Sequence, residues 1–407
     1  MTVEAKISLK NDVQIVINGH KFNPRAMEMC ESITCEMALD KANLITIKFL
    51  NPFKTEYGQA ATSELLWTDS VAFMPGNVVE VWTRWEQDFW TFVDAAVIKG
   101  VVTDFPRDNP PYLEIKALDA SMFLMDGTEE INTFQARTFA PGTSVSDIAA
   151  SVLQDYGFNI DNVDVESPNP TFAVVSQKKS GTSDYAFLKG AANTLNYDFY
   201  LQWNIFSERW DAYWHAQQQA NNERKTFTWG PDFYLNGNKG GLLLDFRPEF
   251  SVRGKSTDVE VFYYDRGAKL WERVPYPPKK KKGKKKKLRW AGDNTTVGQD
   301  LAVISHDAAR GLRIQASGVS VEVIPAQGFR SPEEAAVFAS MWWRARQETI
   351  MRGTGSTIGY PDLRPGDVHD LAGVGPYNSP WYFADVTHKF NNGGVYECEF
   401  VCRSVIP

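Results

Sequence analysis

Short stretches with apolar residues at alternate positions, each followed by a turn signal, are the feature that most constrains the fold of this chain. Val13, Ile15 and Ile17 share one face of a predicted strand, and an Asn-Gly pair typical of a hairpin turn comes directly after it. Similar stretches recur throughout residues 1–120. Short strands separated by frequent turns predict a β-barrel or a β-sandwich.

Strand patterns return near the C-terminus, after one long helix. Ser331, Pro332 and Glu334 occupy the positions of an N-cap, a first-turn proline and a capping-box glutamate, which predicts a helix start. A strand, a PDLRPG turn at residues 361–366, a short strand, a Gly-rich loop and a final strand pair follow. We expect this segment, residues 331–403, to build a surface rather than a site of chemistry.

Helical periodicity marks the middle of the chain. Ser144 followed by Asp147 resembles a capping pair, and apolar residues recur at helical spacing up to Tyr156. A second helix is expected at about residues 183–195, and it runs into a strand at residues 197–201. These patterns predict a mainly β chain with an α+β insertion. A length of 407 residues favours more than one domain.

The four cysteines, Cys30, Cys35, Cys398 and Cys402, are not expected to form a disulfide framework or a zinc site. Four cysteines in so long a chain are unlike a small disulfide-stabilised domain, and their spacings are not those of zinc knuckles. Cys398, Phe400 and Cys402 would share one face of the last strand. We therefore expect reduced thiols in the core, which favours synthesis in a reducing cytoplasm.

Membrane insertion and secretion are not expected from the sequence. No run of about 18 apolar residues occurs, which is the length that a spanning helix needs. The N-terminal residues lack the basic and apolar regions of a secretion signal, and we expect them to form the first strands of the fold.

The most extreme composition lies in residues 275–290. The net charge is −7 although this loop holds eight lysines, so the rest of the chain is strongly acidic. Prolines and like charges disfavour packing, which predicts a projecting loop. We expect the loop to contact a polyanion or a protein partner; the alternative is a solvated loop without a partner. The lysines of this predicted contact are Lys279, Lys280, Lys281, Lys282, Lys284, Lys285, Lys286 and Lys287.

Motifs for catalysis and cofactor binding are not found in the sequence. Gly254-Lys255-Ser256 resembles the end of a phosphate-binding loop, but Glu249 stands where the first glycine is required and a strand pattern follows. We therefore expect no catalytic residue, cofactor or metal site. A glycosidase-type pair of carboxylates needs no motif and stays open as an alternative. The five histidines are scattered, at His20, His215, His306, His369 and His388.

Three stretches, taken in order, carry a more specific interpretation. The first covers residues 75–124, the second residues 174–203, and the third the 331–403 segment with its PDLRPG turn, Val386 and His388. The second stretch has a glutamine, a helix cap and an apolar helix in succession. Its residues are Gln177, Ser183, Asp184, Phe187, Leu188, Ala191 and Ala192.

This combination resembles the late control gene D family of phage tail proteins. Its members are baseplate hub proteins of contractile tails and are related to the hub half of type VI secretion VgrG spikes. The resemblance implies two β-barrel domains similar to a tail-tube subunit, at residues 1–120 and 240–407, with a peripheral α+β module at residues 121–239. Three copies would then present six barrels. A homotrimeric ring would adapt a sixfold tail tube to a threefold spike.

The implied role is structural, in the tail baseplate of a virion or a related injection system, made in the cytoplasm of a host bacterium. The implied partners are a tail tube or tube-initiator protein, baseplate wedge proteins, and a spike that we expect as a separate chain because Pro407 closely follows the last strand. The resemblance implies no role for the loop at residues 275–290. We predict that this loop contacts the tape measure protein or the genome end. The alternatives are a tail-tube initiator, a type VI secretion-like spike hub, a DNA or membrane clamp built on the lysines, and a tail-associated cell-wall hydrolase.

Overall fold

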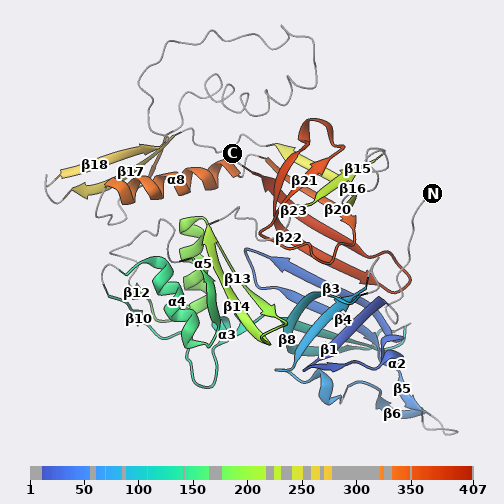
Figure 1. Cartoon of the computed structure of the whole chain (residues 1–407). Helices are drawn as coiled ribbons and strands as arrows, with labels where there is room; N and C mark the ends of the chain where they lie inside the picture. Colours follow the sequence, from blue (N-terminus) through green and yellow to red (C-terminus); the bar gives the residue numbers. More distant parts are fainter. Residues whose placement is uncertain are drawn as a thin grey trace.

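The computed structural model confirms a mainly β chain with an α+β insertion (Figure 1). None of its helices is both long enough and apolar enough to cross a membrane, within the ranges that follow. The structure describes residues 12–55, 61–68, 70–84, 89–107, 109–140, 143–164, 177–216, 224–230, 241–250, 258–265, 270–276, 321–324, 332–348 and 351–405.

A closed six-stranded barrel forms the C-terminal part of the main sheet. Pairing runs in the order β22, β21, β15, β16, β20 and β23, and β23 pairs back to β22. Closure leaves no free strand edge in this unit. The strands are β15 (Thr226–Trp229), β16 (Gly241–Phe250), β20 (Met351–Ile358), β21 (Val368–Ala372), β22 (Ser379–Asn391) and β23 (Glu397–Ser404).

The first β unit is a curved sheet below this barrel in Figure 1. Its ladder runs β2, β1, β7, β8, β9, β4 and β3, and β3 then pairs with β22 of the barrel. We expected a closed barrel here as well. In the described residues this sheet does not close on itself, because β3 pairs with β22 of the barrel and not with another strand at the far end of its own ladder. Its strands are β1 (Val13–Ile17), β2 (His20–Lys21), β3 (Cys30–Ala38), β4 (Leu44–Leu50), β7 (Val78–Thr83), β8 (Thr91–Asp104) and β9 (Tyr112–Leu118).

One hydrophobic core runs beneath both units. It includes the alternating residues predicted from the sequence, among them Val13, Ile15 and Ile17. The four cysteines are buried and free, as expected. A continuous row of fully buried cross-strand partners shows the fusion of the two units: Ala117, Ile45, Cys35, His388, Cys398 and Thr357.

The α+β module follows the first unit along the chain. It contains α3 (Ser121–Asp126), α4 (Val145–Asp155) and α5 (Asp184–Leu195). Its central sheet places β14 (Arg209–Ala216) between β11 (Asn159–Val163) and β13 (Tyr197–Asn204). Both predicted helices are confirmed, as α4 and α5. Their predicted caps are confirmed as well, because Ser144 and Ser183 accept hydrogen bonds from the backbone N–H groups of Asp147 and Ala186.

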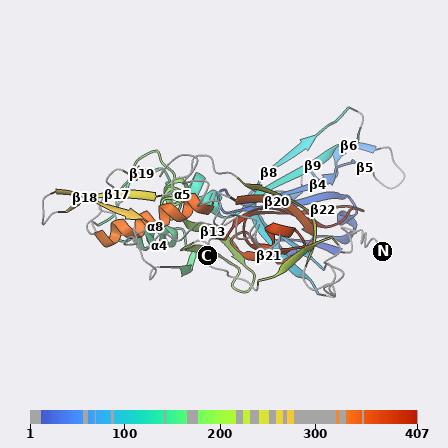
Figure 2. The same cartoon turned by 90° about the horizontal axis from the view of Figure 1, so that it is seen from above.

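Part of the range assigned to the second barrel packs on the module instead. These elements are α8 (Pro332–Glu348), β17 (Asp258–Asp265), β18 (Leu270–Tyr276) and β19 (Val321–Ile324). Buried Val259, Val261, Ala335 and Phe338 share a core with Leu188 of α5. Figure 2 shows α8 and β17 beside α4 and α5, at the end of the molecule away from the barrel. The apolar face of α8 is covered there, so within residues 240–407 the barrel consists of β16, β20, β21, β22 and β23, and α8 with β17, β18 and β19 belongs with the module.

The cap of α4 can be tested by Ser144→Ala, which should lower the free energy of unfolding by about 1 kcal/mol because an N–H of the first turn loses its partner. The matched control is Ser151→Ala, on an exposed position in the interior of the same helix. That control should be neutral or slightly stabilising, since alanine favours helix. Urea unfolding of both variants measures the difference; equal effects would contradict the cap assignment.

Candidate functional site

Polar side chains line the outward side of the joined sheet in rows that cross from the first β unit into the barrel. In one row Thr46, Thr34, Lys389 and Glu397 are successive partners on β4, β3, β22 and β23. Cross-strand partners lie on the same side of a sheet. We call this surface, which includes one apolar residue, Val401, the polar sheet face: Thr34, Glu36, Thr46, Lys116, Asp245, Arg247, Thr354, Ser356, Asp385, Thr387, Lys389, Glu397, Glu399 and Val401.

A second row of the polar sheet face continues across the barrel. Thr387, Glu399, Ser356 and Asp245 are successive partners on β22, β23, β20 and β16. The hydroxyl of Ser356 donates a hydrogen bond to the carboxylate of Asp245. The surface is hollowed here by a cavity of about 460 Å³. The face is therefore a shallow, polar trough rather than an enclosed pocket.

Negative charge prevails on the polar sheet face. Lys389 and Glu399 form an ion pair with 2.5 Å between Nζ and Oε1. Burial raises the pKa of Asp385, and the nearby Asp40 carboxylate raises it further. Hydroxyl groups and interspersed charges, with more carboxylates than cations, make a wall that water wets and that offers little apolar area for docking.

The PDLRPG turn ties the barrel to the first β unit. Arg364 donates hydrogen bonds to the carbonyl oxygens of Pro361, at 2.6 Å, and of Phe92 on β8, at 3.2 Å. The same guanidinium opposes the burial that raises the pKa of Asp94, on β8, to about 7. The sequence identified the turn, but Arg364 as its link to β8 was missed, because nothing local in the chain places β8 beside it.

His388 lies at the centre of a buried polar cluster inside the barrel. Its Nε2 is 3.1 Å from the carbonyl oxygen of Leu363, so Nε2 carries the proton and Nδ1 accepts one from the Tyr396 hydroxyl, 2.7 Å away. Cys398 Sγ is 3.2 Å from the same Nδ1. Burial lowers the pKa of His388 to about 3 and raises the pKa of Cys398 to about 12.

This cluster is unsuited to nucleophilic catalysis. All three side chains are fully buried, and a thiol with a raised pKa stays protonated at neutral pH. The hydrogen bonds instead join the PDLRPG turn to β22 and β23. His388 therefore links the turn to the strands inside the core, a structural role within the 331–403 segment.

A second buried network holds the start of α5. Asp184, fully buried, accepts hydrogen bonds from Lys178, at 2.6 Å, from Arg137 and from the hydroxyl of Tyr156. Its own N–H donates to Thr133. Asp184 is one of the motif residues of the second sequence stretch. Its environment is that of a structural anchor, because a buried carboxylate must be paired to be tolerated.

Two predictions from the sequence remain, one on metal sites and one on the lysine tract. No group of three His, Cys, Asp or Glu side chains that could hold a metal ion is found in the ranges the structure describes. The eight lysines of residues 279–287 lie outside those ranges. Their predicted contact with a polyanion or partner stays a prediction.

Comparison with known proteins shows similarity to solved tail-protein structures. No protein-family model matches the sequence, and no curated protein matches it. A tail protein from Neisseria meningitidis MC58 superposes with a TM-score of 0.60 and 10% identity, covering 97% of this chain and 96% of that one. The 43 kDa tail protein of prophage MuSo2 from Shewanella oneidensis gives 0.57 and 10%, over 97% and 98%. The fold is that of phage tail proteins.

The same fold extends to a secretion component. An E. coli protein described as a component of the type VI secretion system, with structural similarity to the T4 tail proteins gp27 and gp5, superposes with a TM-score of 0.52 and 10% identity. The similarity covers 93% of this chain and 74% of that chain. The fold of this chain is therefore similar both to phage tail proteins and to a type VI secretion component.

Proposed function

We propose that this chain is the structural hub of a contractile phage tail or a related injection particle. Three copies form a ring in the baseplate that connects a sixfold tail tube to a threefold spike. The observation that carries this proposal is the pairing of β3 with β22, which joins two β units side by side in one ladder. Three such chains present six β units, so one ring matches both symmetries.

In this proposal the polar sheet face lines the inside of the ring. Its carboxylates disfavour adhesion of a passing polyanion, and its hydroxyl groups keep the wall wetted. The common core beneath β3 and β22 makes the two units one rigid body, which suits a part that transmits load without changing shape. The role is mechanical and non-enzymatic, with a spike and wedge proteins as partners.

The test is the native mass and symmetry of the purified protein. A trimer of the 45.9 kDa chain, with a ring of pseudo-sixfold appearance in averaged images, is the expected result. A stable hexamer would instead support a tail-tube initiator. A chain that stays monomeric at its highest soluble concentration, with or without the tail tube protein, would contradict the hub.

A further inference from the structure

Phe206 is held out into solvent on a rigid turn between β13 and β14. Its side chain is 92% exposed, the highest value among the large hydrophobic residues that the structure describes. Asn204 Oδ1 accepts hydrogen bonds from the N–H groups of Phe206, at 3.0 Å, and Ser207, at 3.2 Å. Asn204 Nδ2 donates to Asp211, at 2.9 Å. An exposed aromatic ring on a turn fixed in this way loses little freedom when it inserts into a partner.

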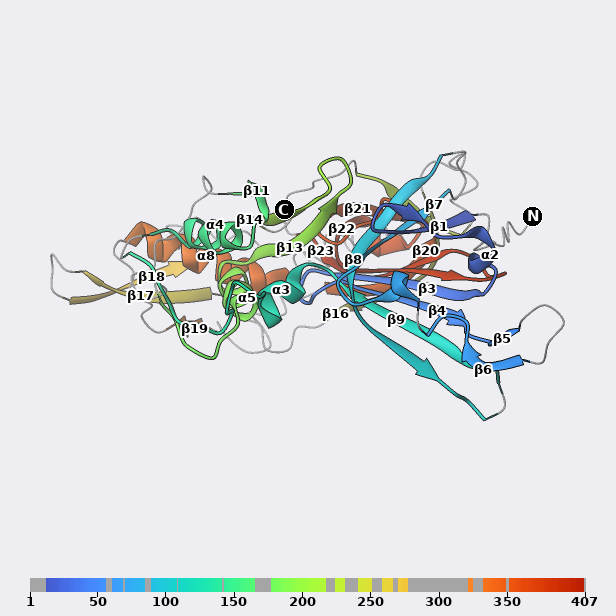
Figure 3. The ribbon, with the colours of Figure 1, turned by 90° about the horizontal axis from the view of Figure 1, so that it is seen from below.

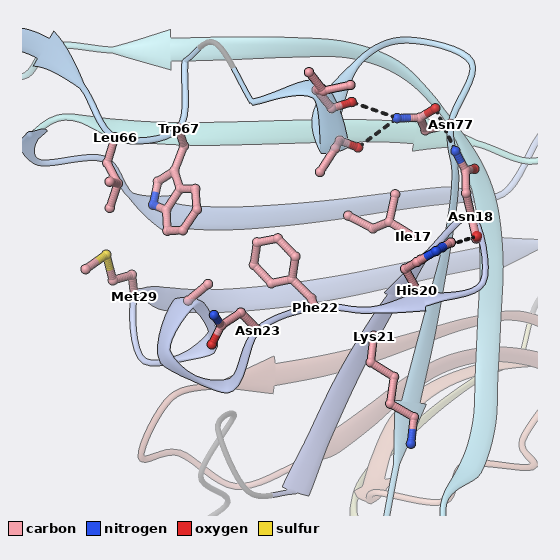
Figure 4. Close-up of a pocket in the computed structure, with 13 residues that line it drawn as sticks. Ile17, Asn18, His20, Lys21, Phe22, Asn23, Met29, Leu66, Trp67 and Asn77 are labelled. Atoms are coloured by element: carbon pink, nitrogen blue, oxygen red, sulfur yellow. Dashed lines mark hydrogen bonds between the residues drawn. The ribbon is translucent and has the colours of Figure 1, made fainter.

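A preformed apolar pocket lies on the first β unit (Figure 4). Its volume is about 650 Å³. Phe22 and Trp67 line it, with ring centroids 5.9 Å apart, and Phe73 packs behind them, 5.4 Å from Phe22. Val71, 71% exposed, lies at its mouth. A pocket of aromatic and aliphatic walls accepts a phenyl ring in offset or edge-on contact.

The rim of this pocket is polar and pinned in place. Asn77 donates to the carbonyl oxygens of Val71 and Ala72, and its own carbonyl accepts from Asn18 Nδ2 at 2.8 Å. Lys21, which is exposed, adds positive charge beside it. Glu208 follows Phe206 by two residues on the β13–β14 turn. Arg209 follows Glu208, so of the two charged residues beside Phe206 it is the Glu208 carboxylate that is opposite in charge to Lys21 and would pair with it.

The geometry points to a contact between copies: Phe206 of one chain inserts into the Phe22–Trp67 pocket of the next. This inference rests on the proposed function only in taking three copies to form the ring. Phe206 belongs to the α+β module, whereas the pocket is built by α2 (Pro24–Met27), β2 and η1 (Val71–Phe73). Figure 3 shows α2 at the end of the molecule away from α4 and α8. A head-to-tail contact of two different surfaces generates a closed ring when its rotation closes.

Cross-linking tests the contact directly. The variant that carries both Phe206→Cys and Val71→Cys should give a covalent closed trimer in oxidised glutathione, seen on a non-reducing gel. Each single variant has one accessible cysteine per chain, because the four native cysteines are buried, so it can link at most two chains and should give no covalent trimer. A wild-type trimer whose double-cysteine variant forms no inter-chain disulfide would overturn the Phe206 contact and leave the hub intact. A wild-type protein without a trimer would overturn the hub itself.

Affinity measurements separate this contact from other occupants of the pocket. Phe206→Ala should raise the trimer dissociation constant about thirtyfold, the effect of losing an interface anchor. Phe89→Ala is the matched control, since Phe89 is 76% exposed on another hairpin; it should leave the constant unchanged.

A charge exchange tests the rim. Lys21→Glu and Glu208→Lys should each weaken association about fivefold, and the two together should restore it. Sedimentation gives the constants, and thermal melts followed by circular dichroism check that each variant folds. Equal losses for Phe206→Ala and Phe89→Ala, or no recovery in the exchanged pair, would count against the contact.

Discussion

Asp184→Ala is expected to lower the free energy of unfolding by about 3–5 kcal/mol, because it leaves the buried ammonium group of Lys178 without its carboxylate. Both side chains of this pair are fully buried, and Nζ and Oδ1 are 2.6 Å apart. Arg137 and Tyr156 lose the same acceptor. The backbone N–H of residue 184, bonded to Thr133 Oγ1, is retained in the variant, so the change reports on the side chain. Urea unfolding followed by tryptophan fluorescence measures the change.

Two further variants separate the buried charge from general damage to the module. Asp161→Ala removes an exposed carboxylate on β11 and should change the free energy of unfolding by less than about 0.5 kcal/mol. Lys178→Met added to Asp184→Ala should recover part of the loss, since the unpaired cation is then gone. If Asp184→Ala behaves like Asp161→Ala, the network is not the anchor of α5.

The second large effect concerns acid and His388. Between pH 7.5 and pH 4.5, the free energy of unfolding of the wild-type protein should fall by about 3 kcal/mol more than that of the His388→Gln variant. The unfolded histidine takes up a proton near its ordinary pKa of 6.5, whereas the folded one, with a pKa of about 3, stays neutral. Its contribution to stability is therefore present above pH 6.5 and is lost as the pH falls toward 3. The glutamine variant has no such group to titrate.

The measurement is chemical unfolding at several pH values for the wild type and the variant. Only the pH dependence of their difference reports on His388, because buried Asp94 and Asp119 have pKa values raised to about 7 and about 6 and gain stability as the pH falls. The same substitution at exposed His20 is the control. A difference that does not vary with pH would mean that the pKa of His388 is not lowered in the folded barrel, which would contradict the prediction.

Local features of the fold were predictable because their causes lie within a few residues. The Asn-Gly turn after β1 forms with φ values of 47° for Asn18 and 77° for Gly19, which this pair tolerates. Ser144 and Ser183 cap α4 and α5 through bonds to backbone three residues away. Alternation along the last strand placed Cys398 and Cys402 in the core.

The candidate site was only partly predictable. Alternation identified the buried and outward residues of each strand, but it did not show that β3 lies beside β22, more than three hundred residues later in the chain. The polar sheet face exists only through that pairing. Phe206 carried one local signal, an Asn two residues before an aromatic between strand patterns, which predicts a turn with its ring exposed.

The sequence by itself determined the strand and helix types, the helix caps, the buried thiols and the turns, since propensity, periodicity and capping act over short distances. Only the tertiary structure decided that β3 of the first unit pairs with β22 of the barrel, and that α8 packs on the module. It also decided that Asp184 and His388 become buried anchors. Those outcomes depend on which apolar faces pack together and which strand edges pair. Both are contacts between segments far apart in the chain, so local sequence patterns do not determine them.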